Sequence, residues 1–220
     1  MSASPLPLVQ VTPAGAADRA LAVGRARQLA WLSLGWHAVE AGVAIIAGIA
    51  AGSVALVGFG ADSLVEMIAG VIVLWRFAAD RSQSDGAERR AQQLIAASFV
   101  LIAAYVGVEA VSNLVAGAVP ETSWVGIGLA VATLATMPSL ALAKARVARR
   151  IGSSATASEG RQNMLCAYLA AALLCGLLAN TLLGWWWADP IVAIAIAALA
   201  LREARDAWRG ESCDCCAPIA

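Results

Sequence analysis

The sequence predicts an all-α membrane protein whose six helices form a transmembrane bundle, with both termini in the cytoplasm. Three observations support this fold class: an apolar composition, six apolar runs, and basic residues confined to alternate connections. Of the 220 residues, 60% are hydrophobic and only 14% are charged, which is unlike a soluble domain of this length. A helix needs about 20 apolar residues to cross about 30 Å of hydrocarbon, and only the helical form satisfies the backbone there.

The six apolar runs follow one another with short connections. They lie near 29–51, 53–75, 92–117, 124–143, 164–184 and 190–201. The first two runs are separated only by Ala51-Gly52, which predicts a tight helical hairpin. The longest polar stretch, Lys144 to Gly160, is basic first and rich in Ser and Gly afterwards. We interpret it as the end of the fourth helix followed by a loop.

Basic residues fix the orientation of these helices. The three connections after the first, third and fifth runs contain no Lys or Arg. All 15 basic residues lie before the first run (Arg19, Arg25, Arg27), after the second (Arg76, Arg81, Arg89, Arg90), after the fourth (Lys144, Arg146, Arg149, Arg150, Arg161), or after the sixth (Arg202, Arg205, Arg209). By the positive-inside rule these segments face the cytoplasm. We therefore expect a multi-pass protein of the cell (plasma or inner) membrane.

Three regions divide the chain. Residues 1–28 are rich in Pro and small residues and predict a mobile cytoplasmic tail, and residues 29–209 form the six-helix domain. Residues 210–220 form a cytoplasmic tail with Cys213, Cys215 and Cys216, which should be reduced there. These thiols either contact a metal ion or are incidental cysteines of a disordered tail.

Polar and ionisable residues inside the runs indicate a functional site, because such groups are costly in a membrane. The spacing of three or four residues within each run places them on one helix face. They are His37 and Glu40 in the first run, Asp62 and Glu66 in the second, Glu109 in the third, and Glu159, Asn163 and Cys166 at the entry of the fifth.

The acidic pair in the second run predicts a cation site. Two neighbouring carboxylates in hydrocarbon repel each other when ionised, and the first three runs contain no Lys or Arg to neutralise them. A divalent cation is the natural partner, with protons taking its place when it leaves. The alternative is a set of protonated acids that form hydrogen bonds between helices.

The stretch SVALVGFGADSLVEMIAG (53–70) resembles the second span of the cation diffusion facilitator family, with Asp62 and Glu66 at the acidic positions. The start of the last run, Asp189-Pro190, resembles the opening of that family's sixth span. The resemblance covers roughly residues 29–208. It implies a six-span metal transporter that forms a homodimer.

The chain departs from the family pattern in two places. Members carry His and Asp, or two Asp, four residues apart in the fifth span, where this chain has Asn163 and Ala167. Glu159 with Asn163 is the possible substitute, one turn earlier. The large cytoplasmic C-terminal domain of most members is absent from this sequence, so the chain resembles a short form of the family.

Together these features predict an efflux transporter for a divalent metal ion of the zinc, cobalt, iron or manganese class, in exchange for protons. Asp62 and Glu66 would be the principal ligands, and Glu159 and Asn163 would supply part of the shell. The extra ligands or proton carriers would be His37, Glu40 and Glu109. Zinc is the favoured ion, because His37 or Cys166 as a ligand selects zinc or cobalt.

Other functions have weaker support from the sequence. We expect no tightly bound cofactor and no nucleic-acid partner; the partners are metal ions, protons and the lipid bilayer. An alternative is a non-transporting member that senses metal or binds a partner protein, which the incomplete fifth-run pattern favours. An integral-membrane enzyme lacks support, because the chain has one His in all.

Overall fold

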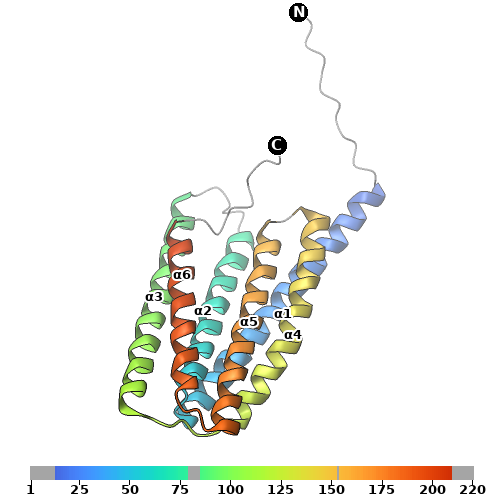
Figure 1. Ribbon diagram of the computed structural model, residues 1–220. Coiled ribbons are helices and arrows are strands. Elements are labelled where there is room, and N and C mark those ends of the chain that lie inside the picture. The colour runs from blue at the N-terminus through green and yellow to red at the C-terminus, as the bar shows by residue number, and fades with distance from the viewer. Residues whose placement is uncertain (1–12, 79–84, 153, 210–220) are drawn as a thin grey trace, which may run out of the picture.

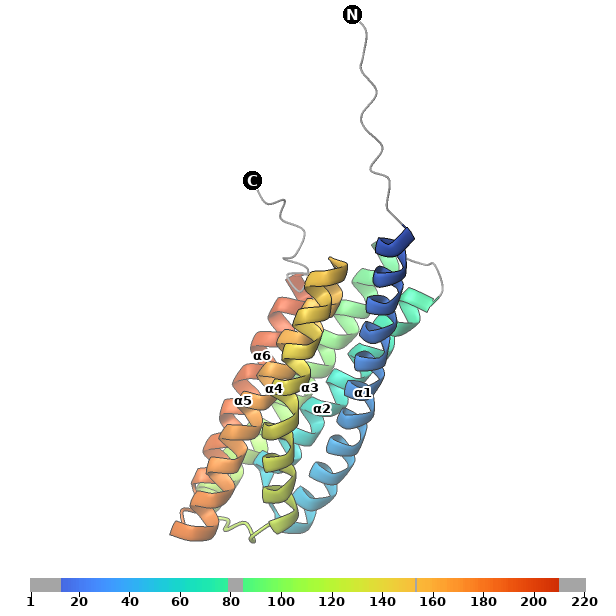
Figure 2. The ribbon, with the colours of Figure 1, turned by 90° about the vertical axis from the view of Figure 1, so that its right-hand side faces the viewer.

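The computed structural model of the chain describes residues 13–78, 85–152 and 154–209. Six helices make up nearly all of these residues, and no strand occurs among them. They are α1 (Pro13–Ala51), α2 (Val54–Ala78), α3 (Asp85–Ala116), α4 (Trp124–Ile151), α5 (Ser154–Leu183) and α6 (Ala188–Arg209). Figures 1 and 2 show them aligned along one direction in a single bundle. The predicted all-α bundle of six helices is confirmed.

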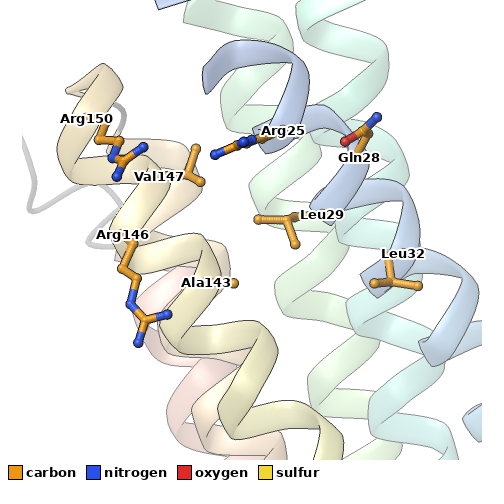
Figure 3. Close-up of a pocket in the computed structure, with 8 residues that line it drawn as sticks. All are labelled: Arg25, Gln28, Leu29, Leu32, Ala143, Arg146, Val147 and Arg150. Atoms are coloured by element: carbon orange, nitrogen blue, oxygen red, sulfur yellow. The ribbon is translucent and has the colours of Figure 1, made fainter. Parts of the chain in front are cut away.

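Neighbouring helices pack as two groups that are joined by α2 and by the contact of α5 with α6. Helix α1 packs on α2 and α4, α4 packs on α5, and α3 packs on α6, while α2 also contacts α3, α5 and α6. Figure 1 shows α3 and α6 along one edge of the bundle and α1 and α4 along the other. The start of α1 and the end of α6 lie at the same end, here called the terminus end. The opposite end, with connections 52–53, 117–123 and 184–187, is the hairpin end. Near the terminus end, α1 and α4 line a groove (Figure 3).

The bundle has an apolar exterior and a partly polar interior. Large side chains such as Ile46 and Leu101 are more than two-thirds exposed, whereas Glu40 is fully buried. Four helices contain segments long and apolar enough to cross a membrane: Ala20–Ala51, Ala96–Ala116, Trp124–Ile151 and Glu159–Leu183. Helices α2 and α6 run through the same bundle, and α6 has charged residues in its last turns. An apolar exterior around a partly polar interior is typical of a membrane-embedded bundle.

The first helix begins earlier than the sequence analysis predicted. It starts at Pro13 and includes residues 13–28, which had been assigned to a mobile tail. Proline is favoured in the first turn of a helix, and the following residues are rich in Ala and Arg, which are strong helix formers. Residues 1–12 and the C-terminal residues 210–220, with Cys213, Cys215 and Cys216, lie outside the described residues.

The loop predicted before the fifth apolar run is wrong. Helix α4 continues to Ile151 and α5 begins at Ser154, so only residues 152–153 connect them. Gly152 has φ 66°, a left-handed conformation that glycine adopts without strain, and its N–H donates to the carbonyl of Ala148. Residues 154–160, which are rich in Ser and Gly, are therefore helical. As a result, Glu159 and Asn163 lie on a continuous helix that enters the bundle.

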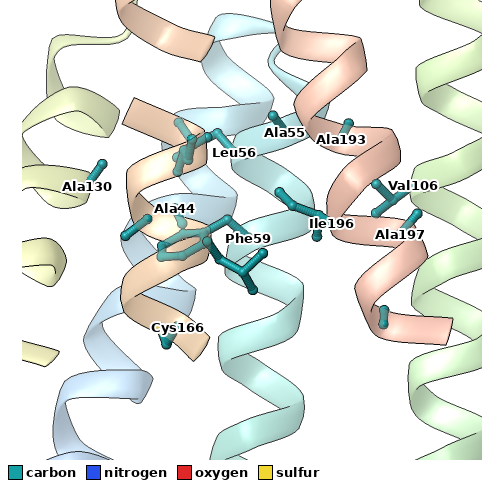
Figure 4. Close-up of a cluster of buried hydrophobic side chains, with 14 of the residues drawn as sticks. Ala44, Ala55, Leu56, Phe59, Val106, Ala130, Cys166, Ala193, Ile196 and Ala197 are labelled. Carbon is teal, nitrogen blue, oxygen red and sulfur yellow. The ribbon is translucent and has the colours of Figure 1, made fainter. Parts of the chain in front are cut away.

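Helices α1 and α2 approach closely, as their two-residue connection predicted. A Cβ atom added at Gly60 would lie 2.9 Å from the backbone nitrogen of Ile45, and one at Gly48 would lie 2.7 Å from that of Val57. Small residues at these positions allow the helix backbones to touch. Farther into the bundle, Figure 4 shows Leu56 and Phe59 of α2 packed among apolar side chains of the neighbouring helices.

Hydrogen bonds join the connections at the hairpin end. Asp189, in the first turn of α6, accepts from the Ser53 hydroxyl and from the backbone N–H of Ala55 at 3.3 Å. The backbone N–H of Glu121 donates to the carbonyl of Ala51 at 2.8 Å. Asn180 of α5 donates to the carbonyl of Pro120 at 2.9 Å. The Asp189 carboxylate thus caps the start of α2 from another helix.

We expect Asp189→Ala to lower the unfolding temperature of the purified protein in detergent by roughly 3–10 °C. The substitution leaves the buried Ser53 hydroxyl and an α2 N–H without their acceptor, which costs about 1–3 kcal/mol. Glu121→Gln is the matched control, because that side chain is exposed at the same end of the bundle. Equal unfolding temperatures for the two variants would contradict the capping role.

Candidate metal centre

Three buried side chains from three helices converge within the bundle. They are His37 of α1, Glu66 of α2 and Cys166 of α5, and one possible ligand atom from each lies within 4.8 Å of the other two. With Zn–N distances of about 2.0 Å and Zn–S distances of about 2.3 Å, tetrahedral ligands lie roughly 3.5 Å apart. A contraction of about 1 Å would therefore allow all three atoms to hold one ion.

Glu66 presents an oxygen with no hydrogen-bond partner to this cluster. Its Oε1 accepts from Gln162 Nε2 at 2.7 Å. Its Oε2 lies 3.2 Å from His37 Nδ1, yet it is buried and accepts no hydrogen bond. His37 can form an ion pair with this oxygen when the imidazole is protonated. A buried oxygen without a hydrogen-bond partner is rare in proteins, and a bound metal ion is one explanation for it. Gln162 was not predicted, although it lies four residues before Cys166 and hence on the same face of α5.

Glu40 lies beside the cluster but is already occupied by donors. Its carboxylate accepts from Ser63 at 2.9 Å and from Thr133. Trp36 Nε1 is a further donor at 3.4 Å, and Cys166 Sγ lies 3.6 Å away. Glu40 Oε2 is also 3.3 Å from His37 Nδ1. Glu40 therefore touches two members of the cluster and holds them in place. The partners Ser63, Thr133 and Trp36 were not predicted.

Asp62 lies one turn from Glu66 toward the hairpin end. It is buried, and none of the described residues forms a hydrogen bond with its carboxylate. Glu66 is close enough for the two charges to interact, and Glu40 and Glu203 of α6 add further negative charge. The acidic pair of the second apolar run is thus buried, with His37 beside Glu66 and no Lys or Arg bound to either acid within the described part of the chain.

Lys144 of α4 occupies the terminus-end side of the cluster. It is buried, and its Nζ lies 3.1 Å from Glu159 Oε2 and donates to Asn163 Oδ1 at 3.3 Å. Asn163 in turn donates to Ser33 Oγ at 3.2 Å. Glu159 and Asn163 therefore bind Lys144 rather than the cluster. Lys144 is predicted from the sequence to lie in a cytoplasmic connection, and this buried role carries no sequence signal.

Glu109 is separate from these groups. It is half-buried on α3, which packs on α6 and α2. Within the described ranges, no hydrogen bond or ion pair connects it to His37, Glu66 or Cys166. Of the seven predicted site residues, the structure brings His37, Glu40, Glu66 and Asp62 together, holds Glu159 and Asn163 around Lys144, and leaves Glu109 apart.

Comparison with known proteins identifies the family. The family model described as the cation efflux transmembrane domain matches residues 30–209. The chain belongs to the cation efflux family. This match confirms the resemblance that the second and sixth apolar runs carry. The matched region begins in α1 and includes every residue of the cluster.

This cation efflux family member is also similar to an uncharacterized transporter from Synechocystis sp. The two are 24% identical over 179 residues, which are 78% of this chain and 58% of that protein. The chain thus spans 58% of the length of the curated relative it matches. What the whole protein transports, and with which partners, is therefore a matter for proposal.

Proposed function

We propose that the protein exports a divalent metal ion of borderline softness, zinc or cobalt, from the cytoplasm in exchange for protons. The observation that carries the proposal is the buried Glu66 oxygen without a hydrogen-bond partner, beside His37 and Cys166. A set of one oxygen, one nitrogen and one sulfur ligand favours zinc or cobalt over magnesium or calcium, which prefer oxygen alone.

The charges of the three ligands suit a dication in a membrane. A Glu66 carboxylate and a Cys166 thiolate together carry two negative charges, and the His37 imidazole is neutral when it binds a metal. The complex with a dication would then be neutral, which lowers the cost of holding it in hydrocarbon. Asp62, one turn toward the hairpin end, is the next carboxylate the ion would meet on its way out.

Proton exchange follows from the same chemistry. Binding requires the Cys166 thiol to lose its proton, and the proton returns when the ion leaves. Without the ion, Asp62 and Glu66 are neighbouring buried carboxylates that cannot both stay ionised at low cost, so a proton replaces part of the lost charge. The His37 imidazole can carry another proton.

The test uses purified protein in sealed liposomes that contain a zinc-sensitive dye and, separately, a pH-sensitive dye. We expect zinc entry to be faster when the side that receives the ion is acidic, and to be accompanied by proton movement in the opposite direction. Zinc flux that is indifferent to the pH gradient, with no proton signal, would indicate a channel. If the buried acids only form hydrogen bonds with each other, neither dye should give a metal-dependent signal.

We expect Cys166→Ser to reduce zinc transport roughly tenfold or more relative to manganese transport. Serine has a similar size, but a neutral hydroxyl is a poor ligand for a borderline ion, whereas manganese prefers oxygen. Cys175→Ser is the control, because Cys175 is an exposed thiol on the same helix. Zinc should also protect Cys166, and not Cys175, from thiol alkylation. An unchanged zinc-to-manganese ratio in Cys166→Ser would remove the thiol from the site.

A second candidate function is a member of the family that binds metal without transporting it. Lys144 favours this candidate, because a fixed cation between the cluster and the terminus end opposes the passage of a dication. Zinc binding by the wild-type protein with no flux in liposomes would select it.

For the transporter we propose the cell membrane as the site of action, with the terminus end in the cytoplasm, and a homodimer as the family resemblance implies.

A further inference from the structure

The groove between α1 and α4 near the terminus end is lined by basic and apolar side chains and lies apart from the metal centre. Its volume is about 460 Å³. The lining residues are Arg25, Gln28, Leu29 and Leu32 of α1, and Ala143, Arg146, Val147 and Arg150 of α4. Figure 3 shows the Arg25 side chain extending from α1 toward α4, where Val147 and Arg150 lie.

The three arginines of this groove have no acidic partner among the residues that the structure describes. Arg25, Arg146 and Arg150 are exposed, and none forms an ion pair or hydrogen bond with any of the described residues. Arg146 and Arg150 are four residues apart and so lie on one face of α4. Asp18 lines an adjoining hollow with Arg25 and Arg150, but no ion pair joins it to either of them. The groove therefore has an excess of positive charge.

The position of the groove suits a lipid more than a soluble anion. Arg25 lies just before the first apolar run, while Leu29 and Leu32 belong to it, so the charged rim passes into an apolar floor along the membrane normal. Trp31, exposed on the same helix, is of the type that gathers at membrane interfaces. Basic pockets between helices on the cytoplasmic side of a membrane fit anionic headgroups.

We propose that this groove binds an anionic phospholipid of the cytoplasmic leaflet. The guanidinium groups of Arg25, Arg146 and Arg150 bind the headgroup phosphate, which arginine can contact through two parallel hydrogen bonds. An acyl chain lies against Leu29, Leu32 and Val147. A second copy of this chain does not fit the groove, because the same face would present three further arginines to these three. The bound lipid holds α1 to α4 at the terminus end.

The test compares lipid binding to the full-length protein in neutral detergent. The unfolding temperature is measured at increasing concentrations of phosphatidylglycerol, and phosphatidylcholine serves as the neutral lipid for comparison. We expect phosphatidylglycerol, and not phosphatidylcholine, to raise the unfolding temperature. In Arg25→Gln/Arg146→Gln/Arg150→Gln, its apparent affinity should fall roughly tenfold or more. The matched control is Arg149→Gln/Arg202→Gln/Arg205→Gln, which removes three exposed arginines of the same membrane face outside the groove and should change affinity less than about twofold.

A second variant guards against a trivial loss of folding. Arg25→Lys/Arg146→Lys/Arg150→Lys keeps the positive charge but loses the paired hydrogen bonds, so it should bind the lipid more tightly than the glutamine variant and less tightly than the wild type. Equal loss of affinity in the groove variant and the control would overturn the proposal, because general surface charge would then explain it. Inorganic phosphate or glycerol phosphate raising the unfolding temperature as much as phosphatidylglycerol would also overturn it. A change of oligomeric state in the groove variant, without loss of lipid affinity, would assign the groove to contact between copies.

Discussion

Replacing Glu66 by Gln is expected to abolish zinc transport while the protein still folds and enters the membrane. Glutamine keeps the shape of the side chain and its bond from Gln162, but it removes the charge and the buried Oε2 that no hydrogen bond occupies. Changes in residues that only support metal ligands cost 10–100-fold in affinity, so loss of a ligand should cost at least about 100-fold. Asp62→Asn should abolish transport as well, since Asp62 supplies the second carboxylate of the pair. Zinc flux in liposomes, at equal protein content, measures both.

Glu109→Gln is the matched control for these two variants. It also neutralises an acid within an apolar run, but the structure places Glu109 on α3, without a bond to the cluster among the described residues. It should keep zinc flux within about twofold of the wild type. If Glu109→Gln lost transport while Glu66→Gln kept it, the site would lie nearer α3 than we propose.

Glu40→Gln should have the second largest effect, and it should act on stability as well as on metal binding. An amide nitrogen in place of Glu40 Oε1 would face the donors Thr133 and Trp36 Nε1 and leave them without an acceptor. Each orphaned donor costs about 1–3 kcal/mol, so the unfolding temperature should fall by roughly 4–10 °C. Because Glu40 also contacts His37 and Cys166, zinc affinity should fall by about 10–100-fold.

The two glutamates are distinguished by measuring unfolding in the presence of a metal chelator. Glu66→Gln should leave the unfolding temperature unchanged or raise it, because it removes the repulsion between Glu66 and Asp62. Glu40→Gln should lower it. Destabilisation of similar size in both variants would show that Glu66 forms structural bonds, and the separation of ligand and supporting residue would be lost.

The sequence was sufficient to predict the helices and to single out the two acids of α2 as candidate site residues, because apolar length and intramembrane charge are local signals. Asp62 and Glu66 share one face by their spacing alone. The sequence could not show which residues of other helices face them. The spacing placed Cys166 on the face of Glu159 and Asn163 but not beside Glu66, and Gln162 gave no signal by itself. Their roles depend on the rotation of α5 about its axis, which is set by packing against α4 and α2.

Lys144 shows why the terminus-end connection was misjudged. Composition alone marks a basic stretch followed by Ser and Gly as a loop, yet Gly152 ends one helix and the next begins almost at once. Helix α4 therefore carries Lys144 within the bundle, where Glu159 and Asn163 bind it. A long amphipathic side chain such as that of lysine can enter a bundle when a carboxylate forms an ion pair with it. Here the two partners of the ion pair lie on different helices.

The hydrogen bonds at the hairpin end have a mechanical consequence. Asp189 fastens the start of α2 to the start of α6, so this end of α2 acts as a fulcrum. From Val54 to Glu66 the helix rises by about 18 Å, and a rotation of about 10° there would carry Glu66 through about 3 Å. That displacement is comparable to the 3.2 Å between Glu66 and His37. Binding and releasing an ion would then need only a small change in the angle between α2 and its neighbours, while the hairpin end of α2 does not move.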